Sequence, residues 1–229
     1  MYYLYYYPGN ASLAPHMLLQ ALEVEYELVL VDRDNQAQKS SQYLKLNPAG
    51  RIPTLVVDGK KSKETQCGNK AESKPLVIFE SAAICLYLLE QHPSSTLMPS
   101  MADTSARSRF YQWFMYITNT VQSELMLYFY PQKYTTSVNG AQGIEDMAQV
   151  RVTAMLKLLD QQLAQYDYIA GDISIADYFL FMVANWAANF KQPPLSFPHL
   201  SVYMQKMAQR IEVQAVFAKE GRELTRYLI

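Results

Sequence analysis

The amino-terminal part of the chain alternates short apolar runs, which are typical of strands, with amphipathic segments, which are typical of helices. The first run is aromatic and ends at a Pro-Gly pair, after which leucines recur at helical spacing. The last two runs are joined by a polar stretch without apolar periodicity, which predicts a hairpin with a long loop. The predicted strands are Tyr2–Tyr7, Tyr26–Val31, Pro53–Val57 and Leu76–Phe79, and the predicted helices begin at Ser12, near Tyr43 and at Ser81.

A different pattern follows a Pro/Ser-rich break over residues 91–100. Beyond the break, apolar residues repeat at intervals of three and four, and no segment is typical of a strand. The pattern therefore predicts an α/β domain over residues 1–90, a linker over 91–100 and an all-helical bundle over 101–229.

A helix start is signalled inside the predicted bundle. Ser174 can cap a helix while Asp177, three residues on, reaches back to the Ser174 N–H, which is the arrangement of a capping box. We expect this cap to serve folding, and its loss to cost about 1 kcal/mol.

Composition narrows the classes of partner. The 229 residues carry a net charge of -1, so they produce no basic field for nucleic acid. No apolar run reaches the roughly 18 residues of a membrane span, and the aromatic start lacks the cationic residues of a signal peptide. We expect a cytoplasmic protein. The polar stretch 58–74 is expected to be a solvated insertion.

Candidate chemistry lies at two points of the predicted α/β domain. A turn that ends at Ile52 before Pro53 is a common place for a cis peptide, which leaves the Ile52 backbone available to a ligand. Glu80 and Ser81 lie where a strand gives way to a helix, so a carboxylate, a hydroxyl and backbone N–H groups converge there. Such a site suits a zwitterionic amino-acid head group.

Metal and cysteine chemistry receive little support from the sequence. The three histidines have no metal-ligand spacing, and we predict no metal. Cys67 falls in the polar insertion, and Cys85 is one turn into an apolar helix, where it is expected to be a small buried hydrophobe.

These features together resemble the glutathione S-transferase family over essentially the whole chain. Within the family the chain is most similar to the bacterial beta class. The residues that carry this similarity are Tyr6, Pro8-Gly9 and Ser12–His16 near the start, and Phe181, Trp186, Met204, Met207-Ala208 and Val213-Gln214 near the end. The resemblance implies a thioredoxin-like amino-terminal domain, a helical carboxy-terminal domain, glutathione as substrate, a homodimer and a role in detoxification.

The family's glutathione site can be placed residue by residue. The resemblance implies that the Ile52 backbone, before Pro53, pairs with the cysteinyl part of glutathione. It further implies that Ser81 holds the γ-glutamyl carboxylate and that Glu80 takes the amino group. Arg51 and Lys39 are candidates for the glycine carboxylate, although such residues are often only solvated charges.

The sequence departs from the beta class at the position that faces the sulfur. The family's cysteine is replaced by Ala11, and the class's histidine in the second domain is replaced by Gln122. Ser12 is the main candidate for activating the sulfur, because it lies at a helix start where N–H groups favour a thiolate. Ser12 being only an N-cap is an equal alternative. Asn10 offers an amide donor and Tyr6 a phenol, and we rank Asn10 above Tyr6.

The leading hypothesis is a glutathione transferase that adds the thiolate of glutathione to small apolar electrophiles. The second-substrate pocket is expected to include Tyr116 and Gln122, and a core role for Tyr116 is the alternative. Two other functions remain open: glutathione or protein binding without catalysis, and glutathione-dependent disulfide reduction.

Overall fold

The computed structural model describes residues 1–58 and 74–227. These residues form two compact units. The first contains Met1–His92 and Ala218–Arg222, and the second contains Pro93–Phe217 and the described residues from Glu223 onward. Most of the predicted insertion over 58–74, with Cys67, lies outside the described residues.

A four-stranded sheet with strand order β2-β1-β3-β4 organises the first unit. Strand β1 pairs in parallel with β2 and antiparallel with β3, which in turn pairs antiparallel with β4. The predicted hairpin of the last two strands is therefore confirmed. The strands are β1 (Tyr2–Tyr6), β2 (Tyr26–Leu30), β3 (Thr54–Val57) and β4 (Leu76–Phe79).

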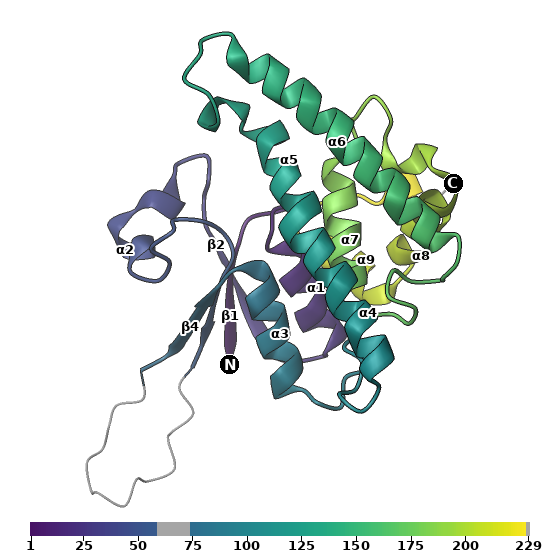
Figure 1. The fold of residues 1–229 in the computed structure, drawn as a ribbon. Helices are drawn as coiled ribbons and strands as arrows, with labels where there is room; N and C mark the ends of the chain where they lie inside the picture. Colours follow the sequence, from purple (N-terminus) through teal and green to yellow (C-terminus); the bar gives the residue numbers. More distant parts are fainter. Residues whose placement is uncertain (59–73, 228–229) are drawn as a thin grey trace, which may run out of the picture. The chain divides into compact units, whose positions relative to one another are not determined.

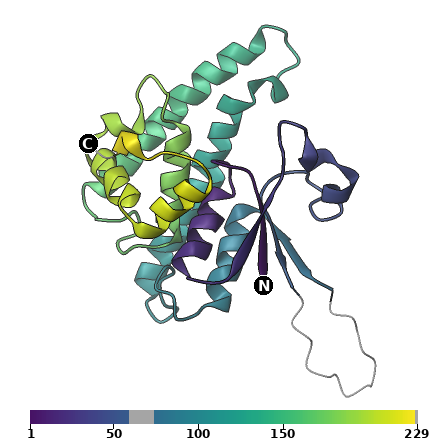
Figure 2. The same cartoon turned by 180° about the vertical axis from the view of Figure 1, so that it is seen from behind.

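Helices flank both faces of this sheet. Helices α1 (Leu13–Ala21) and α3 (Ser81–Gln91) lie side by side on one face, and α2 (Ser41–Leu44) lies on the other side, as both views show (Figures 1 and 2). Central side chains such as Leu4 and Leu55 are fully buried, as is Leu18 on α1. The predicted α/β, thioredoxin-like class is thus confirmed.

The second unit is built from helices, and its described residues include no strand of a sheet. Apolar residues of its longest helix, α6, are buried at intervals of three or four, as the sequence pattern predicts. The α-helices are α4 (Thr104–Met115), α5 (Gln122–Phe129), α6 (Gly140–Leu163), α7 (Ile175–Trp186), α8 (Pro198–Ala208) and α9 (Ile211–Lys219), the last of which ends in the first unit.

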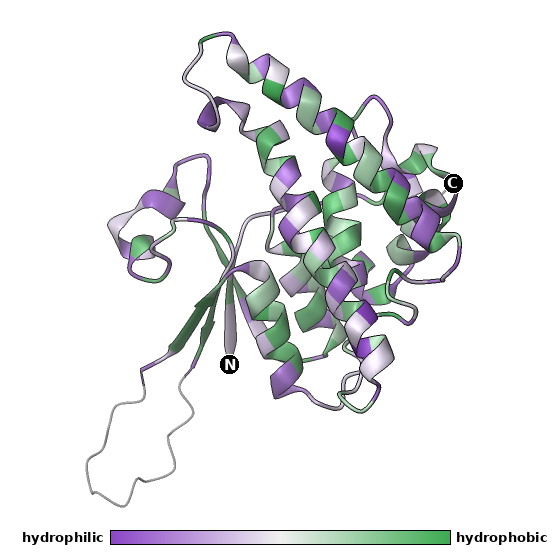
Figure 3. Ribbon diagram, viewed as in Figure 1, coloured by the Kyte–Doolittle hydropathy of each residue, from purple (hydrophilic) through white to green (hydrophobic). Residues whose placement is uncertain are grey.

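Helix α7 forms the core of this second unit. All residues from Ile175 to Ala184 are buried, and Figure 3 shows the hydrophobic colour along most of α7. The predicted capping box at Ser174 and Asp177 is present at its start. A helix that is apolar all round is typical of a central position in a bundle.

Two features of the described helices were not predicted. The segment Tyr116–Val121 between α4 and α5 is π-helical, and a 3-10 turn over Ala37–Lys39 precedes α2. In the described part of the chain, no helix has the length and apolar character needed to cross a membrane.

Candidate functional site

The register of the sheet gathers three predicted site elements at one end of β3. Tyr5 of β1 pairs with Thr54, and Thr54 pairs on its other side with Phe79 of β4. The loop that follows β1, the residues that precede β3 and the residues that follow β4 therefore meet at this end of the sheet. The first unit thus brings together the predicted residues at 6–12, 51–53 and 80–81.

The residues before β3 form a turn held by buried side chains. The peptide between Ile52 and Pro53 is cis, as predicted. The Tyr43 hydroxyl donates to the Arg51 carbonyl at 2.7 Å, and the Asn47 amide donates to the same oxygen at 2.8 Å. Neither the N–H nor the carbonyl of Ile52 has a hydrogen-bond partner among the described residues. The Ile52 backbone is therefore a fixed and available pairing edge.

The start of α3 offers a cluster of donors. Glu80 has a φ of 72°, which is uncommon for a residue other than glycine and often marks functional sites. The N–H of Ile84 bonds to the Glu80 carbonyl, while the N–H groups of residues 81–83 have no partner within the described parts of the chain. Ser81 begins the helix, as predicted. The geometry suits a carboxylate, because a helix N-terminus carries partial positive charge.

Two cationic side chains lie near the turn before β3. Lys39, at the end of the 3-10 turn, has its Nζ close to Gly50, because a Cβ built on Gly50 would be 2.8 Å from that atom. Gly50 has a φ of 59°, so the turn requires glycine here. Arg51 is exposed and adjoins Ile52.

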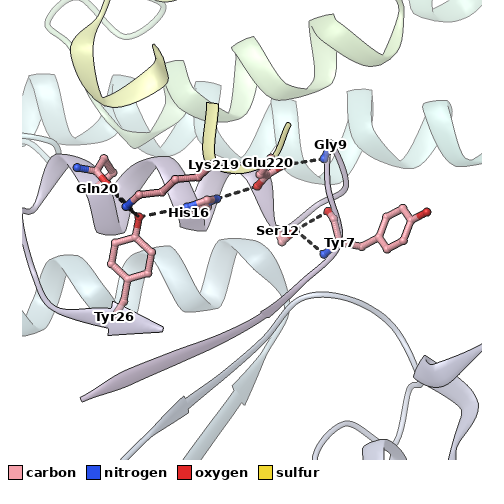
Figure 4. Close-up of polar contacts among 8 residues, drawn as sticks. All are labelled: Tyr7, Gly9, Ser12, His16, Gln20, Tyr26, Lys219 and Glu220. Atoms are coloured by element: carbon pink, nitrogen blue, oxygen red, sulfur yellow. Dashed lines mark hydrogen bonds and ion pairs between the residues drawn. The ribbon is translucent and has the colours of Figure 1, made fainter. Parts of the chain in front are cut away.

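The loop after β1 is closed by Ser12. The fully buried Ser12 hydroxyl donates to the Tyr7 carbonyl at 3.1 Å and lies 3.3 Å from the Tyr7 N–H (Figure 4). Ser12 occupies the N-cap position of α1, as predicted, but its side chain makes no capping hydrogen bond to the helix. A capping hydroxyl accepts an N–H of the helix, but the Ser12 oxygen accepts the Tyr7 N–H instead, while its proton is donated to the Tyr7 carbonyl.

Other groups of this loop retain donor capacity. The Asn10 side-chain oxygen accepts the Ala11 N–H at 2.6 Å, which leaves the Asn10 amide N–H groups for a ligand. The N–H of Ser12 has no acceptor among the described residues. Burial, with a smaller contribution from the Glu220 carboxylate, raises the pKa of the Tyr6 phenol, so this hydroxyl stays protonated at neutral pH.

The remaining predicted residues lie in the second unit. Tyr116 begins the π-helical segment, packs edge-on against Trp113, and has its pKa raised by burial. Gln122 follows this segment at the start of α5. π-Helical turns occur frequently at functional sites, but no sequence signal pointed to this one.

Cysteine and metal chemistry find no support among the described residues. Cys85 is fully buried, as predicted, and burial raises the pKa of its thiol well above the ordinary value. Its thiolate is therefore strongly disfavoured. No group of three or more His, Cys, Asp or Glu side chains that could hold a metal ion occurs in the described ranges.

Comparison with known proteins gives consistent matches over most of the chain. Residues 11–91 match the family described as glutathione S-transferase, N-terminal domain, and residues 121–210 match the corresponding C-terminal domain. Glutathione S-transferase GstA of Escherichia coli O157:H7 is 27% identical over 223 residues, which cover 95% of this chain and 98% of the relative.

Two further matches add to this similarity. Glutathione S-transferase hmp2 of Hypomyces subiculosus is 30% identical over 189 residues, which cover 75% of this chain and 76% of that protein. The solved structure of a sphingomonad glutathione S-transferase complexed with glutathione is 26% identical, with a TM-score of 0.75, and the match covers 96% of this chain and 98% of that one.

Proposed function

Because the chain belongs to the glutathione S-transferase family, we propose that its first unit binds reduced glutathione and presents the thiolate to small apolar electrophiles. The observation that carries this proposal is the convergence of an unpartnered Ile52 backbone and the donor-rich start of α3 at one end of the sheet. An extended peptide with a zwitterionic end matches that pair of features.

We propose the following placement of glutathione. The Ile52 backbone, fixed by the cis bond to Pro53, pairs with the cysteinyl residue. Ser81 and the N–H groups at the start of α3 hold the γ-glutamyl carboxylate, because a helix N-terminus favours an anion and charge-assisted hydrogen bonds are stronger than neutral ones. Glu80 takes the amino group. Lys39 and Arg51 are the cations for the glycine carboxylate.

The sulfur is proposed to lie against the loop after β1. The Asn10 amide and the Ser12 N–H are its donors, since both lack acceptors in the described parts of the chain. The Ser12 hydroxyl acts indirectly by holding Tyr7, and the protonated Tyr6 phenol is a third donor. Donors that favour the thiolate lower the pKa of the thiol.

Three finer features complete the proposal. Tyr116 and Gln122 of the second unit belong to the second-substrate pocket. This pocket is broad and apolar, and it selects the electrophile by shape. The protein acts as a homodimer in the cytoplasm, and sedimentation of the purified protein tests the dimer. The beta class is the proposed subgroup, with Ala11 in place of its cysteine.

The central experiment measures binding and turnover in the same preparations. Calorimetry with reduced glutathione and conjugation of a chloronitroaromatic are measured for the wild type, Ser81→Ala and the exposed control Ser94→Ala. Loss of a hydrogen bond to a charged group costs about 1.5–3 kcal/mol, so Ser81→Ala should weaken binding roughly tenfold or more while Ser94→Ala has no effect.

The outcomes separate the alternatives. Absence of binding at millimolar glutathione refutes the proposal. Binding without turnover on any electrophile indicates a non-catalytic relative. Turnover of a hydroxyethyl disulfide, without conjugation of aryl halides, indicates glutathione-dependent disulfide reduction.

A further inference from the structure

A short carboxy-terminal segment, residues 218–222, belongs to the first unit. Its Glu220 side chain is fully buried and uses both carboxylate oxygens (Figure 4). One oxygen accepts the Gly9 N–H at 2.7 Å, and the other lies 2.7 Å from Nδ1 of the fully buried His16 on α1. A carboxylate removed from water in this way is stable only when such partners satisfy it.

The network continues from His16 to the end of α9. The other ring nitrogen of His16 lies 3.1 Å from the Tyr26 hydroxyl, which donates to Gln20 at 2.9 Å. The Lys219 ammonium donates to Tyr26 and to Gln20, at 2.8 Å each. The ring of His16 is therefore held at both nitrogens, and its orientation toward Glu220 is fixed.

Gly9 is the point at which this network meets the proposed sulfur site. It directly precedes Asn10, Ala11 and Ser12, and it has a φ of 65°. A Cβ built on Gly9 would clash with the Arg222 guanidinium, so the segment also packs closely over this turn. Glu220 thus bonds to the backbone of the loop that carries the proposed thiolate donors.

We propose that Glu220 is a positioning residue for the glutathione thiolate. By holding the Gly9 N–H against α1 through His16, it keeps the Asn10 amide and the Ser12 N–H aimed at the sulfur. This inference rests on the proposed function and adds a residue far from the amino-terminal motifs. A purely structural role would change stability without changing the acidity of the bound thiol.

The test compares substitutions that keep or remove the acceptor. Glu220→Gln keeps an oxygen for the Gly9 N–H, whereas Glu220→Met has a similar length and no acceptor. Glu223→Met, at an exposed glutamate nearby in sequence, is the matched control. Steady-state kinetics with a chloronitroaromatic, and ultraviolet titration of the bound glutathione thiolate, are measured for each variant.

For Glu220→Met we expect kcat to fall about tenfold, with a smaller change in KM for glutathione, and the pKa of the bound thiol to rise toward that of free glutathione. Glu220→Gln should retain most of kcat, and Glu223→Met should match the wild type. A folded Glu220→Met protein with the wild-type thiol pKa and kcat overturns the proposal, as does one that loses only stability.

Native-state hydrogen exchange keeps the proposal testable if Glu220→Met does not fold. The Gly9 amide of the wild type should exchange as slowly as the amides of α1. In Glu220→Gln, which keeps an acceptor, the Gly9 amide should still exchange more slowly than amides of loops that have no hydrogen-bond acceptor. Fast exchange of Gly9 in the wild type overturns the proposal. Because this readout needs no turnover, it is distinct from a failure of the proposed function.

Discussion

Replacing Asp177 by alanine should destabilise the second unit far more than the loss of an ordinary helix cap. The fully buried carboxylate accepts the N–H of Ile169 at 2.9 Å and the N–H of Ser174 at 2.8 Å. It also lies 3.2 Å from the Tyr203 hydroxyl, which has a second acceptor in the Asp177 carbonyl at 2.8 Å. The substitution therefore leaves two buried N–H groups without acceptors.

The magnitude follows from this count. A buried donor that loses its partner costs about 1–3 kcal/mol, so two such donors predict a loss of about 2–6 kcal/mol in the free energy of unfolding. A helix cap alone predicts about 1 kcal/mol. Even the lower end of the range is a large part of a typical stability of about 5–15 kcal/mol.

Urea denaturation at neutral pH, followed by tryptophan fluorescence, measures this loss. Both tryptophans of the chain, Trp113 and Trp186, lie in the second unit, so the signal reports on its unfolding. Asp172→Ala, at an exposed aspartate of the same turn, is the control and should change stability by less than about 0.5 kcal/mol. If Asp177→Ala lowers the free energy of unfolding by less than about 1 kcal/mol, with an unchanged m value, the reasoning is refuted.

Three other perturbations test the account. Burial raises the pKa of Asp177 from 3.8 to about 6, so the stability that it contributes is greatest below about pH 4 and falls by about 3 kcal/mol as pH rises through 6. In urea titrations, Asp177→Asn should therefore lower the free energy of unfolding more at about pH 4 than at about pH 7, and an equal loss at both pH values contradicts this. Gly50→Ala should lower stability by about 1–2 kcal/mol in thermal unfolding because its φ is positive, whereas Gly143→Ala, in an open position of α6, should raise it by about 0.5–1 kcal/mol. Cys85→Ala should keep the wild-type conjugation rate and lose about 1 kcal/mol of stability, and loss of turnover in the folded variant would show that this buried thiol takes part in the chemistry.

Much of the fold could be predicted because local and long-range preferences agree. The aromatic run at 2–7, the hairpin strands and the capping box at Ser174 all carry strong local signals, and the structure contains each of them. The cis bond before Pro53 was predictable for the same reason, since proline limits both its own backbone and the preceding peptide.

The hydrogen bonds of the loop after β1, which carries the proposed thiolate donors, could not be predicted from local rules. A serine before a helix is usually expected to cap it, yet the Ser12 hydroxyl bonds to Tyr7 instead. The choice depends on where the end of β1 places its carbonyl, which the sequence of the turn does not reveal. The same limit applies to the π-helical turn at Tyr116–Val121, because its extra residue has no compositional signature.

The long-range pairing between polar side chains could not be predicted from the sequence either. Glu220 and His16 are separated by 204 positions, and no pattern around residue 220 indicated that this segment returns to the first unit. Glutamate is almost never fully buried unless it is paired, so there was no reason in the sequence to expect Glu220 in the interior. Its partners can be identified only from the folded structure. Candidate ligand contacts at Ile52 and Ser81, in contrast, follow from single turns and helix starts that the sequence does mark.

The most direct test of the central claim is an ultraviolet titration of the glutathione thiol bound to the wild-type protein. The donors around residues 10–12 predict a pKa at least one unit below that of free glutathione, which corresponds to about 1.4 kcal/mol of preference for the thiolate. A bound thiol that titrates like free glutathione would contradict the account.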